Sequence, residues 1–253
     1  MPKRLLCALA LPLCCAAGEP DDWIATDRPD FVDAPAVVGK GRLQLETGWL
    51  RSTEARSTPW MLRVGVSDAV ELRLESDGRV MERDRDRLGA ARARGWGDTA
   101  LSAKWRLREA DGDSGAPAVG LVAQADFATG SRGFKGNGTR PSLRLPLEWD
   151  LPQDLNLGVM PGIYRDRDDQ GRHVPVGQFG ITLAKNFGER AYTFIELATP
   201  RIARGRDGGS MASFDFGGGY SLTRDLHMDV GVMLGLNRRT PDRALTIGLS
   251  VRL

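Results

Sequence analysis

The sequence predicts an all-β chain that folds as a transmembrane, up-and-down antiparallel β-barrel of about twelve strands. Three observations predict this fold. Polar and apolar residues alternate with a period of two over most of the chain, tight turns alternate with longer polar connections, and the last residues form one more alternating strand.

Alternation is clearest near the C-terminus. There Leu226, Met228, Val230, Val232, Leu234 and Leu236 form one apolar face, and Leu245 to Leu253 repeat the pattern at odd positions. Successive side chains of a strand point to opposite faces, so this pattern indicates strands with one apolar face. The twelve predicted strands lie near residues 41–52, 59–66, 70–76, 96–108, 118–129, 140–150, 154–164, 175–186, 190–199, 211–222, 226–237 and 243–253.

The connections between these strands alternate in length. Tight turns are expected at 67–69, 151–153, 187–189 and 223–225, and longer polar stretches at 77–95, 130–139, 165–174 and 200–210. If both termini of the chain face the periplasm, every tight turn is periplasmic and every one of these long loops is external, as in outer-membrane barrels. The connection 109–117 is longer than this rule prefers.

Alternation alone does not decide which face points inward, and a soluble barrel would have its apolar face inside. The even strand count and a last strand able to close the ring favour the membrane barrel. So do aromatic residues near strand ends, where interfacial girdles belong. These are Trp49, Trp60, Trp96, Trp149, Tyr164, Tyr192 and Tyr220. The final Leu253, which is not aromatic, argues against it.

The first residues have the layout of a secretory signal peptide. Lys3 and Arg4 precede the apolar run Leu5–Cys15, and Cys15-Ala16-Ala17 is a small-residue cleavage site. A lipoprotein is the alternative, but Leu13 stands where a small residue is expected before Cys14. We expect residues 1–17 to be removed, residues 18–40 to form a periplasmic segment, and residues 41–253 to form the barrel in the bacterial outer membrane.

Cleavage would remove all three cysteines (Cys7, Cys14 and Cys15) and two of the 35 basic residues, leaving 33 basic and 33 acidic residues. The remaining chain then has no disulfide or thiolate site, and its zero net charge disfavours nucleic acid as a partner. Beyond residue 17 no apolar run is long enough for a membrane-spanning helix.

Catalytic, metal and cofactor sites are not expected. His173 lies in an external loop, His227 lies on the polar face of its strand, and no Gly-x-Ser-x-Gly motif accompanies them. The stretch 166–171 resembles the start of a calcium loop, but its twelfth position is Gly177. The glycine-rich stretch 130–138 lacks the Gly-Lys-Ser/Thr end of a phosphate loop.

Two segments leave alternatives open. The charged run 82–87 is either an internally paired, solvated loop or a contact to lipopolysaccharide phosphates. The segment Thr26-Asp27-Arg28-Pro29-Asp30 either folds into the barrel as a plug or orders the mouth of the barrel.

The polar faces of the strands carry charges of both signs. This predicted lumen lining is either a set of cross-strand ion pairs that fills the interior or a surface that selects solutes. It consists of Arg42, Glu46, Arg63, Glu71, Arg73, Glu75, Lys104, Arg106, Asp126, Arg144, Glu148, Glu196, Asp215, Asp229 and Arg252.

Several motifs resemble a family of outer-membrane "transporter" barrels labelled putative meta-pathway of phenol degradation. They are Ile24–Phe31, Gly39–Glu46, Arg63–Asp68, Glu71–Leu74, Trp96–Thr99, Lys104–Leu107, Ala128–Gly130 and Pro141–Arg144. The likeness covers about residues 24–253 and departs from the family at Gly39-Lys40, where a proline is usual before the Gly-Arg strand start.

The resemblance implies a channel for small organic compounds and carries no catalytic residues. We therefore expect a passive channel for small organic solutes, aromatic ones among the candidates, surrounded by outer-membrane lipid and lipopolysaccharide. A non-conducting structural or adhesion barrel acting through its loops is the alternative, and a barrel enzyme has little support. The sequence does not give the oligomeric state.

Overall fold

The computed structural model describes residues 22–83, 91–112, 114–167 and 170–253. The predicted signal peptide (1–17) lies outside the described residues, as do most of the charged run 82–87 and two positions of the stretch 166–171. Among the described residues, no helix is long and apolar enough to cross a membrane.

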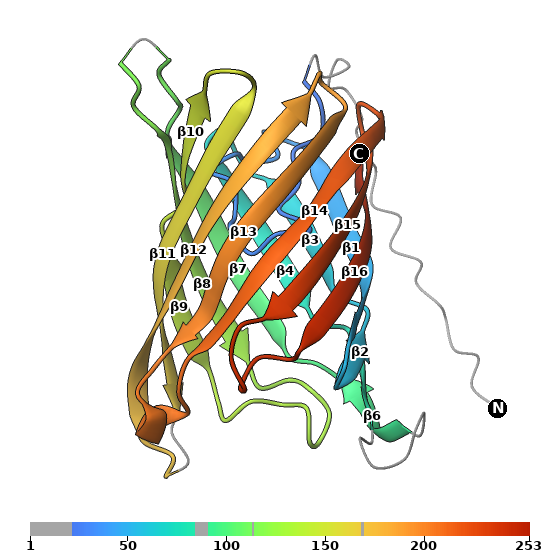
Figure 1. Cartoon of the computed structure of the whole chain (residues 1–253), viewed down its shortest axis with the longest axis vertical. Coiled ribbons are helices and arrows are strands. Elements are labelled where there is room, and N and C mark those ends of the chain that lie inside the picture. Colours follow the sequence, from blue (N-terminus) through green and yellow to red (C-terminus); the bar gives the residue numbers. More distant parts are fainter. Residues whose placement is uncertain (1–21, 84–90, 113, 168–169) are drawn as a thin grey trace, which may run out of the picture.

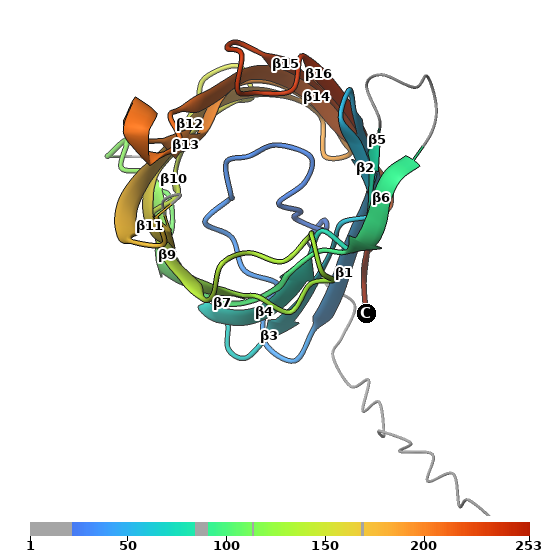
Figure 2. The same cartoon turned by 90° about the horizontal axis from the view of Figure 1, so that it is seen from below.

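The chain folds into one closed antiparallel β-barrel of twelve strands, in which neighbours in sequence are neighbours in the sheet (Figures 1 and 2). One of the twelve is divided into β9 and β10. The strands of the wall are β1 (Leu43–Ser52), β3 (Trp60–Gly65), β4 (Val70–Ser76), β7 (Thr99–Arg108), β8 (Ala118–Phe127), β9 (Arg140–Arg144), β10 (Leu147–Leu151), β11 (Leu155–Arg167), β12 (His173–Phe187), β13 (Ala191–Ile202), β14 (Met211–Thr223), β15 (Leu226–Gly235) and β16 (Arg243–Arg252).

The first and last strands close the ring. β1 pairs with β16 in a continuous register from Gln44↔Arg252 to Ser52↔Ala244. Closure pairs the backbone groups of both edge strands, which a bilayer interior requires because it offers no water as a hydrogen-bond partner. The predicted fold class and the pairing of the last strand are therefore confirmed.

The two rims of the barrel differ. One rim, here called the turn end, carries the tight connections 66–69, 152–154, 188–190 and 224–225 together with the longer connection 109–117. The other rim, the loop end, carries the connections at 128–139, 168–172, 203–210 and 236–242. The last strand, β16, finishes at the turn end (Figure 1).

The two faces of the wall have opposite chemistry. Glu46, Glu71 and Lys104 are fully buried, whereas Leu72 and Leu101 on alternate positions are about half exposed. A soluble barrel would show the reverse, with charges outside. Apolar side chains around the whole outer surface and charges inside are the arrangement of a membrane barrel.

Some element boundaries differ from those predicted. The predicted loop 77–95 contains a hairpin of β5 (Arg79–Arg83) and β6 (Ala91–Trp96), which extends the wall at the loop end through β2 (Ala55–Ser57). The predicted strand 140–150 is interrupted at Leu145 and Pro146, because proline has no N–H for the ladder. β11 and β12 are longer than predicted, so their loop shortens to residues 168–172.

Candidate functional site

Residues 22–40, here called the inner segment, lie inside the ring of strands. Figure 2 shows this segment in blue within the barrel when the molecule is viewed along its length. The sequence predicts a periplasmic segment at residues 18–40 and leaves open whether 26–30 folds into the barrel as a plug or orders the mouth of the barrel. The structure places the described part of this stretch in the lumen, as in the plug alternative, because wall charges buried inside the barrel find their partners there.

The centre of the lumen holds one carboxylate of the inner segment against three cations of the wall. Lys104 Nζ lies 3.0 and 2.9 Å from the two carboxylate oxygens of Asp27, and Arg63 Nη1 lies 3.5 Å from Oδ2. Arg73 also donates to Asp27. All four side chains are almost completely buried. Three strands, β3, β4 and β7, thus converge on one residue of the inner segment.

Two wall carboxylates complete this central cluster. Glu71 accepts hydrogen bonds from Arg63 at 3.0 Å and from Arg73 at 2.6 Å, and Glu46 accepts one from Arg63 at 2.8 Å. The cross-strand neighbours Arg63 and Arg73 face each other in register. Their like charges are tolerable only because carboxylates lie between and beside them.

The backbone of the inner segment is also bound by wall side chains. Lys104 Nζ donates to the carbonyl oxygens of Ala34 at 2.5 Å and Ala36 at 3.1 Å. Across the lumen, Glu196 accepts hydrogen bonds from the N–H groups of Phe31 and Val32 at 2.8 and 2.9 Å. An irregular segment has no partners for these groups within itself, so the wall charges satisfy them.

Further ion pairs hold the inner segment at other points along its length. Arg28 contacts Asp229 at 3.4 Å and donates to Thr246 at 2.8 Å. Asp33 pairs with Arg73 at 3.2 Å and with Arg144 at 3.0 Å. Near the turn end, Asp22 contacts both Arg42 and Arg252 at 3.1 Å.

Glycines in the wall make room for the inner segment. A Cβ atom added at Gly180 would lie 2.6 Å from a methyl carbon of Val32 and 2.9 Å from the ring of Phe31. One added at Gly231 would lie 3.2 Å from Pro29. The wall is therefore shaped to accept this segment against it.

Burial alone would raise the pKa of Asp27. The attraction of Arg63, Arg73 and Lys104 outweighs burial and lowers this pKa below its ordinary value. Asp27 therefore stays charged under ordinary conditions, which keeps the central ion pairs intact.

The inner segment divides the lumen into two chambers. The chamber toward the loop end has a volume of about 320 Å³, and Arg28, Glu75, Asp126 and Arg140 are among its lining residues. The chamber toward the turn end has a volume of about 300 Å³, and its lining includes Trp23, Glu148 and Tyr192. Each chamber has room for one small molecule rather than a continuous wide pore.

The structure brings the predicted lining together unevenly. Glu46, Arg63, Glu71, Arg73 and Lys104 form the central cluster, whereas the other predicted positions contact the inner segment singly, line a chamber or lie apart. Arg106 is one that lies apart, donating to the Asp68 carbonyl at 2.7 Å at the turn end. Asp215, near the Glu196 position, accepts a hydrogen bond from Ser213 at 3.2 Å.

Sequence reasoning missed the partners of these charges. Asp27, Arg28 and Asp33 of the inner segment were not in the predicted set, although the first two belong to the motif considered as a plug. Tyr164 and Tyr192 were predicted at the membrane interface, but both face inward. The hydroxyl of Tyr192 donates to the Arg28 carbonyl at 3.0 Å, and that of Tyr164 lies 3.3 Å from Arg201.

The two histidines differ in exposure to solvent. His173 is exposed at the loop end. His227 is buried, and its Nδ1 lies 2.9 Å from Ser221 Oγ. Among the residues that the structure describes, its Nε2 has no hydrogen-bond partner, so none of their carboxylates orients this pair as in a hydrolase triad. Within the described part of the chain, no group of three or more His, Cys, Asp or Glu side chains could hold a metal ion.

This arrangement agrees with a comparison against protein families. Residues 26–253 match the family described as "Putative MetA-pathway of phenol degradation". The chain belongs to this family. The match begins within the inner segment, so the family pattern includes residues of the segment as well as the wall. Among curated proteins, none matches this family member significantly in sequence.

Solved structures similar to this family member are outer-membrane barrels. The COG4313 outer membrane channel from Pseudomonas putida F1 has a TM-score of 0.64 and 14% identity, over 90% of this chain and 100% of that one. The NanC porin has a TM-score of 0.56 and 16% identity, over 83% and 100% of the two chains. The KdgM porin has a TM-score of 0.56 and 9% identity, over 82% and 98%. At these identities the likeness establishes the shared fold.

Proposed function

We propose that the chain is a passive channel of the bacterial outer membrane for small organic solutes, with its loop end facing the cell exterior. The observation that carries this proposal is the closed wall with an apolar outer face and a charged lumen that is occupied by a non-covalently held segment. A purely structural barrel could fill its interior with wall side chains alone. A separate segment held by ion pairs can move and open a path.

The size of the chambers supports small solutes. Volumes of about 300 and 320 Å³ on the two sides of the inner segment suit single small molecules. Aromatic compounds are candidates because the family description refers to phenol degradation. The names of the similar structures, a channel and two porins, agree with transport in general and do not identify a solute.

A non-conducting barrel acting through its loops is the second candidate. The density of bonds between the inner segment and the wall favours it, since Asp27 alone contacts three buried cations. The two candidates differ in whether the inner segment leaves its bound position in the lumen often enough to let solute through.

Solute flux into reconstituted vesicles separates the two candidates. Vesicles that contain the purified protein should swell in small organic osmolytes such as benzoate and catechol, and more slowly in sugars larger than the chambers. A variant that lacks residues 22–40 is the matched control and should swell faster in both. Absence of swelling with the full protein, together with swelling of the deletion variant, would favour the non-conducting barrel.

A further inference from the structure

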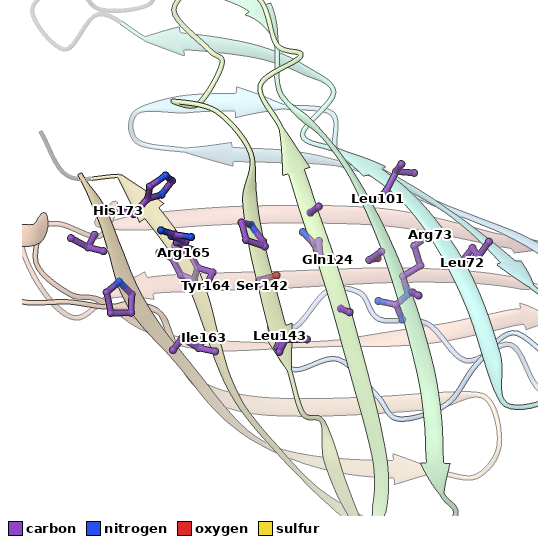
Figure 3. A pocket seen from close by; sticks show the side chains of 17 residues that line it. Leu72, Arg73, Leu101, Gln124, Ser142, Leu143, Ile163, Tyr164, Arg165 and His173 are labelled. Carbon is purple, nitrogen blue, oxygen red and sulfur yellow. The ribbon is translucent and has the colours of Figure 1, made fainter. Parts of the chain in front are cut away.

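The outer, lipid-facing surface of the wall is hollowed at one place. A cavity of about 1010 Å³ crosses β4, β7, β8, β9, β11 and the beginning of β12 (Figure 3). Its walls carry Leu72 and Leu101 on one side and Leu143 and Ile163 on the other, each about half exposed. This outer groove lies on the face opposite to the inner segment and belongs to neither lumen chamber.

Small residues in register form the floor of the outer groove. The cross-strand row runs Leu72↔Ala103, Ala103↔Ala123, Ala123↔Leu143 and Leu143↔Ile163. Alanines on two central strands between larger residues on the flanking strands leave a depression in an otherwise filled apolar surface. The next row continues it through Leu101↔Ala125 and Ala125↔Pro141 toward the loop end.

The end of the outer groove near the loops is basic. Arg165 lines the groove two positions beyond Ile163 on the same face of β11, with Pro175 and His173 on the adjacent strand (Figure 3). Arg167, paired in register with His173, follows on this exposed face and donates to the Gly171 carbonyl at 2.9 Å.

A second hollow continues the basic end. It has a volume of about 890 Å³, shares His173 and Pro175 with the groove, and is also lined by Arg172, Arg204 and Arg206. The acidic groups nearby that the structure describes are already engaged. Asp166 on the inward parity of β11 pairs with Arg201 at 2.5 Å, and Asp207 lies 3.8 Å from Arg206. Counted over the described residues, arginines therefore exceed carboxylates at this end of the groove.

We propose that the outer groove binds one acylated, phosphorylated lipid of the outer leaflet, of the lipid A type. Its acyl chains would lie over Ala103 and Ala123, and a phosphate would lie against Arg165 and Arg167. Guanidinium groups suit phosphates because they donate two hydrogen bonds from a fixed fork. An apolar solute would need the groove but not the cations, so the charge at one end favours a lipid with an anionic head group. The inference rests on the proposed orientation, with the loop end outside.

Binding of a fluorescent lipid A to the full protein in detergent tests the proposal. Ala123→Leu fills the floor, and the double change Arg165→Ala with Arg167→Ala removes the cations. The matched controls lie on exposed positions of the opposite wall: Val230→Leu adds apolar bulk, and Arg243→Ala removes an arginine near the loop end. We expect affinity to fall at least tenfold in both groove variants and to stay within twofold in both controls. Dephosphorylated lipid A should bind the wild type as weakly as intact lipid A binds the arginine variant.

Three results would overturn the proposal. Equal affinity in all variants would mean non-specific lipid contact. Loss of binding in Ala123→Leu but not in the arginine variant would indicate an apolar ligand. Conversion of a dimer to a monomer by Ala123→Leu would show that the groove binds a second copy of the chain. Vesicle swelling measured on the same variants keeps this test separate from the channel proposal, because a protein without flux can still bind lipid and a channel can lack this site.

Discussion

Replacing Asp27 by Asn should release the inner segment from its bound position in the lumen. Asparagine keeps the size of the side chain and some of its hydrogen bonds but removes the charge that Arg63, Arg73 and Lys104 share. Leaving a buried charge without its partner typically costs about 3–5 kcal/mol. Departure of the segment would let water reach the three cations and so relieve this cost.

The magnitude can be expressed as a population. We take the full penalty to apply only while the segment is bound in the lumen. A penalty of about 3 kcal/mol would then shift the equilibrium between bound and released states by roughly a hundredfold, because about 1.4 kcal/mol is a factor of ten. Single-channel recording in planar bilayers should show the open probability of Asp27→Asn rising toward that of the variant without residues 22–40.

Asp22→Asn is the matched control for this experiment. Asp22 also pairs with two arginines, but its side chain is 66% exposed, and exposed pairs contribute about 0–1 kcal/mol. The open probability of Asp22→Asn should differ from that of the wild type by no more than a few-fold. An Asp27→Asn protein that inserts normally and conducts like the wild type would refute the idea that the central ion pairs hold the segment.

Further predictions address packing, the wall, pH and orientation. Gly180→Val should push against Val32 and raise open probability, whereas Gly177→Val on the same strand should not; equal currents in both would contradict the packing argument. Leu197→Arg on the lipid face should lower the stability of the folded barrel by about 2–4 kcal/mol in urea titrations monitored by heat-modifiable gel migration, and a smaller loss would contradict the facing of β13. Because the pKa of Asp27 is lowered when the segment is seated, its contribution to closure is present above the ordinary carboxylate pKa and is lost only as pH falls toward the lowered value. Currents of the wild type should therefore stay below those of Asp27→Asn between pH 7 and about pH 5, since a free aspartate titrates near pH 3.9; equal currents in that window would contradict the assignment. A single cysteine at Arg206 should react with an impermeant thiol label on intact cells and one at Gln153 should not, and the reverse would invert the orientation.

The strands of the wall were predictable from the sequence because the pattern that specifies each strand lies within that strand. Period-two alternation along β15 and β16 specifies one apolar face per strand, and turn residues mark where each strand ends. The hairpin of β5 and β6 was missed because residues 77–95 are rich in charged side chains, which is typical of a solvated loop. Tyr192 could have been placed inward, since it lies four positions before Glu196 on the same face of β13.

The contents of the lumen were not predictable in the same way. The ion pairs of Asp27 join it to residues from 36 to 77 positions away, and the segment around it has no periodicity that would reveal them. The charged parity of the strands did indicate an interior rich in ion pairs. It could not show that part of the countercharge comes from the inner segment rather than from neighbouring strands.

A reversible cross-link of the inner segment to the wall tests the central claim most directly. A Cβ at Gly180 would lie 2.6 Å from a methyl carbon of Val32, so cysteines at both positions are within reach of a disulfide. The mature chain has no other cysteine if residues 1–17 are removed. In planar bilayers, we expect the oxidised Val32→Cys, Gly180→Cys protein to carry no single-channel current, and addition of dithiothreitol to restore openings within minutes. The Val32→Cys protein alone should be insensitive to both reagents. Equal currents through the oxidised and reduced double variant, with the disulfide verified by mass spectrometry, would contradict the account.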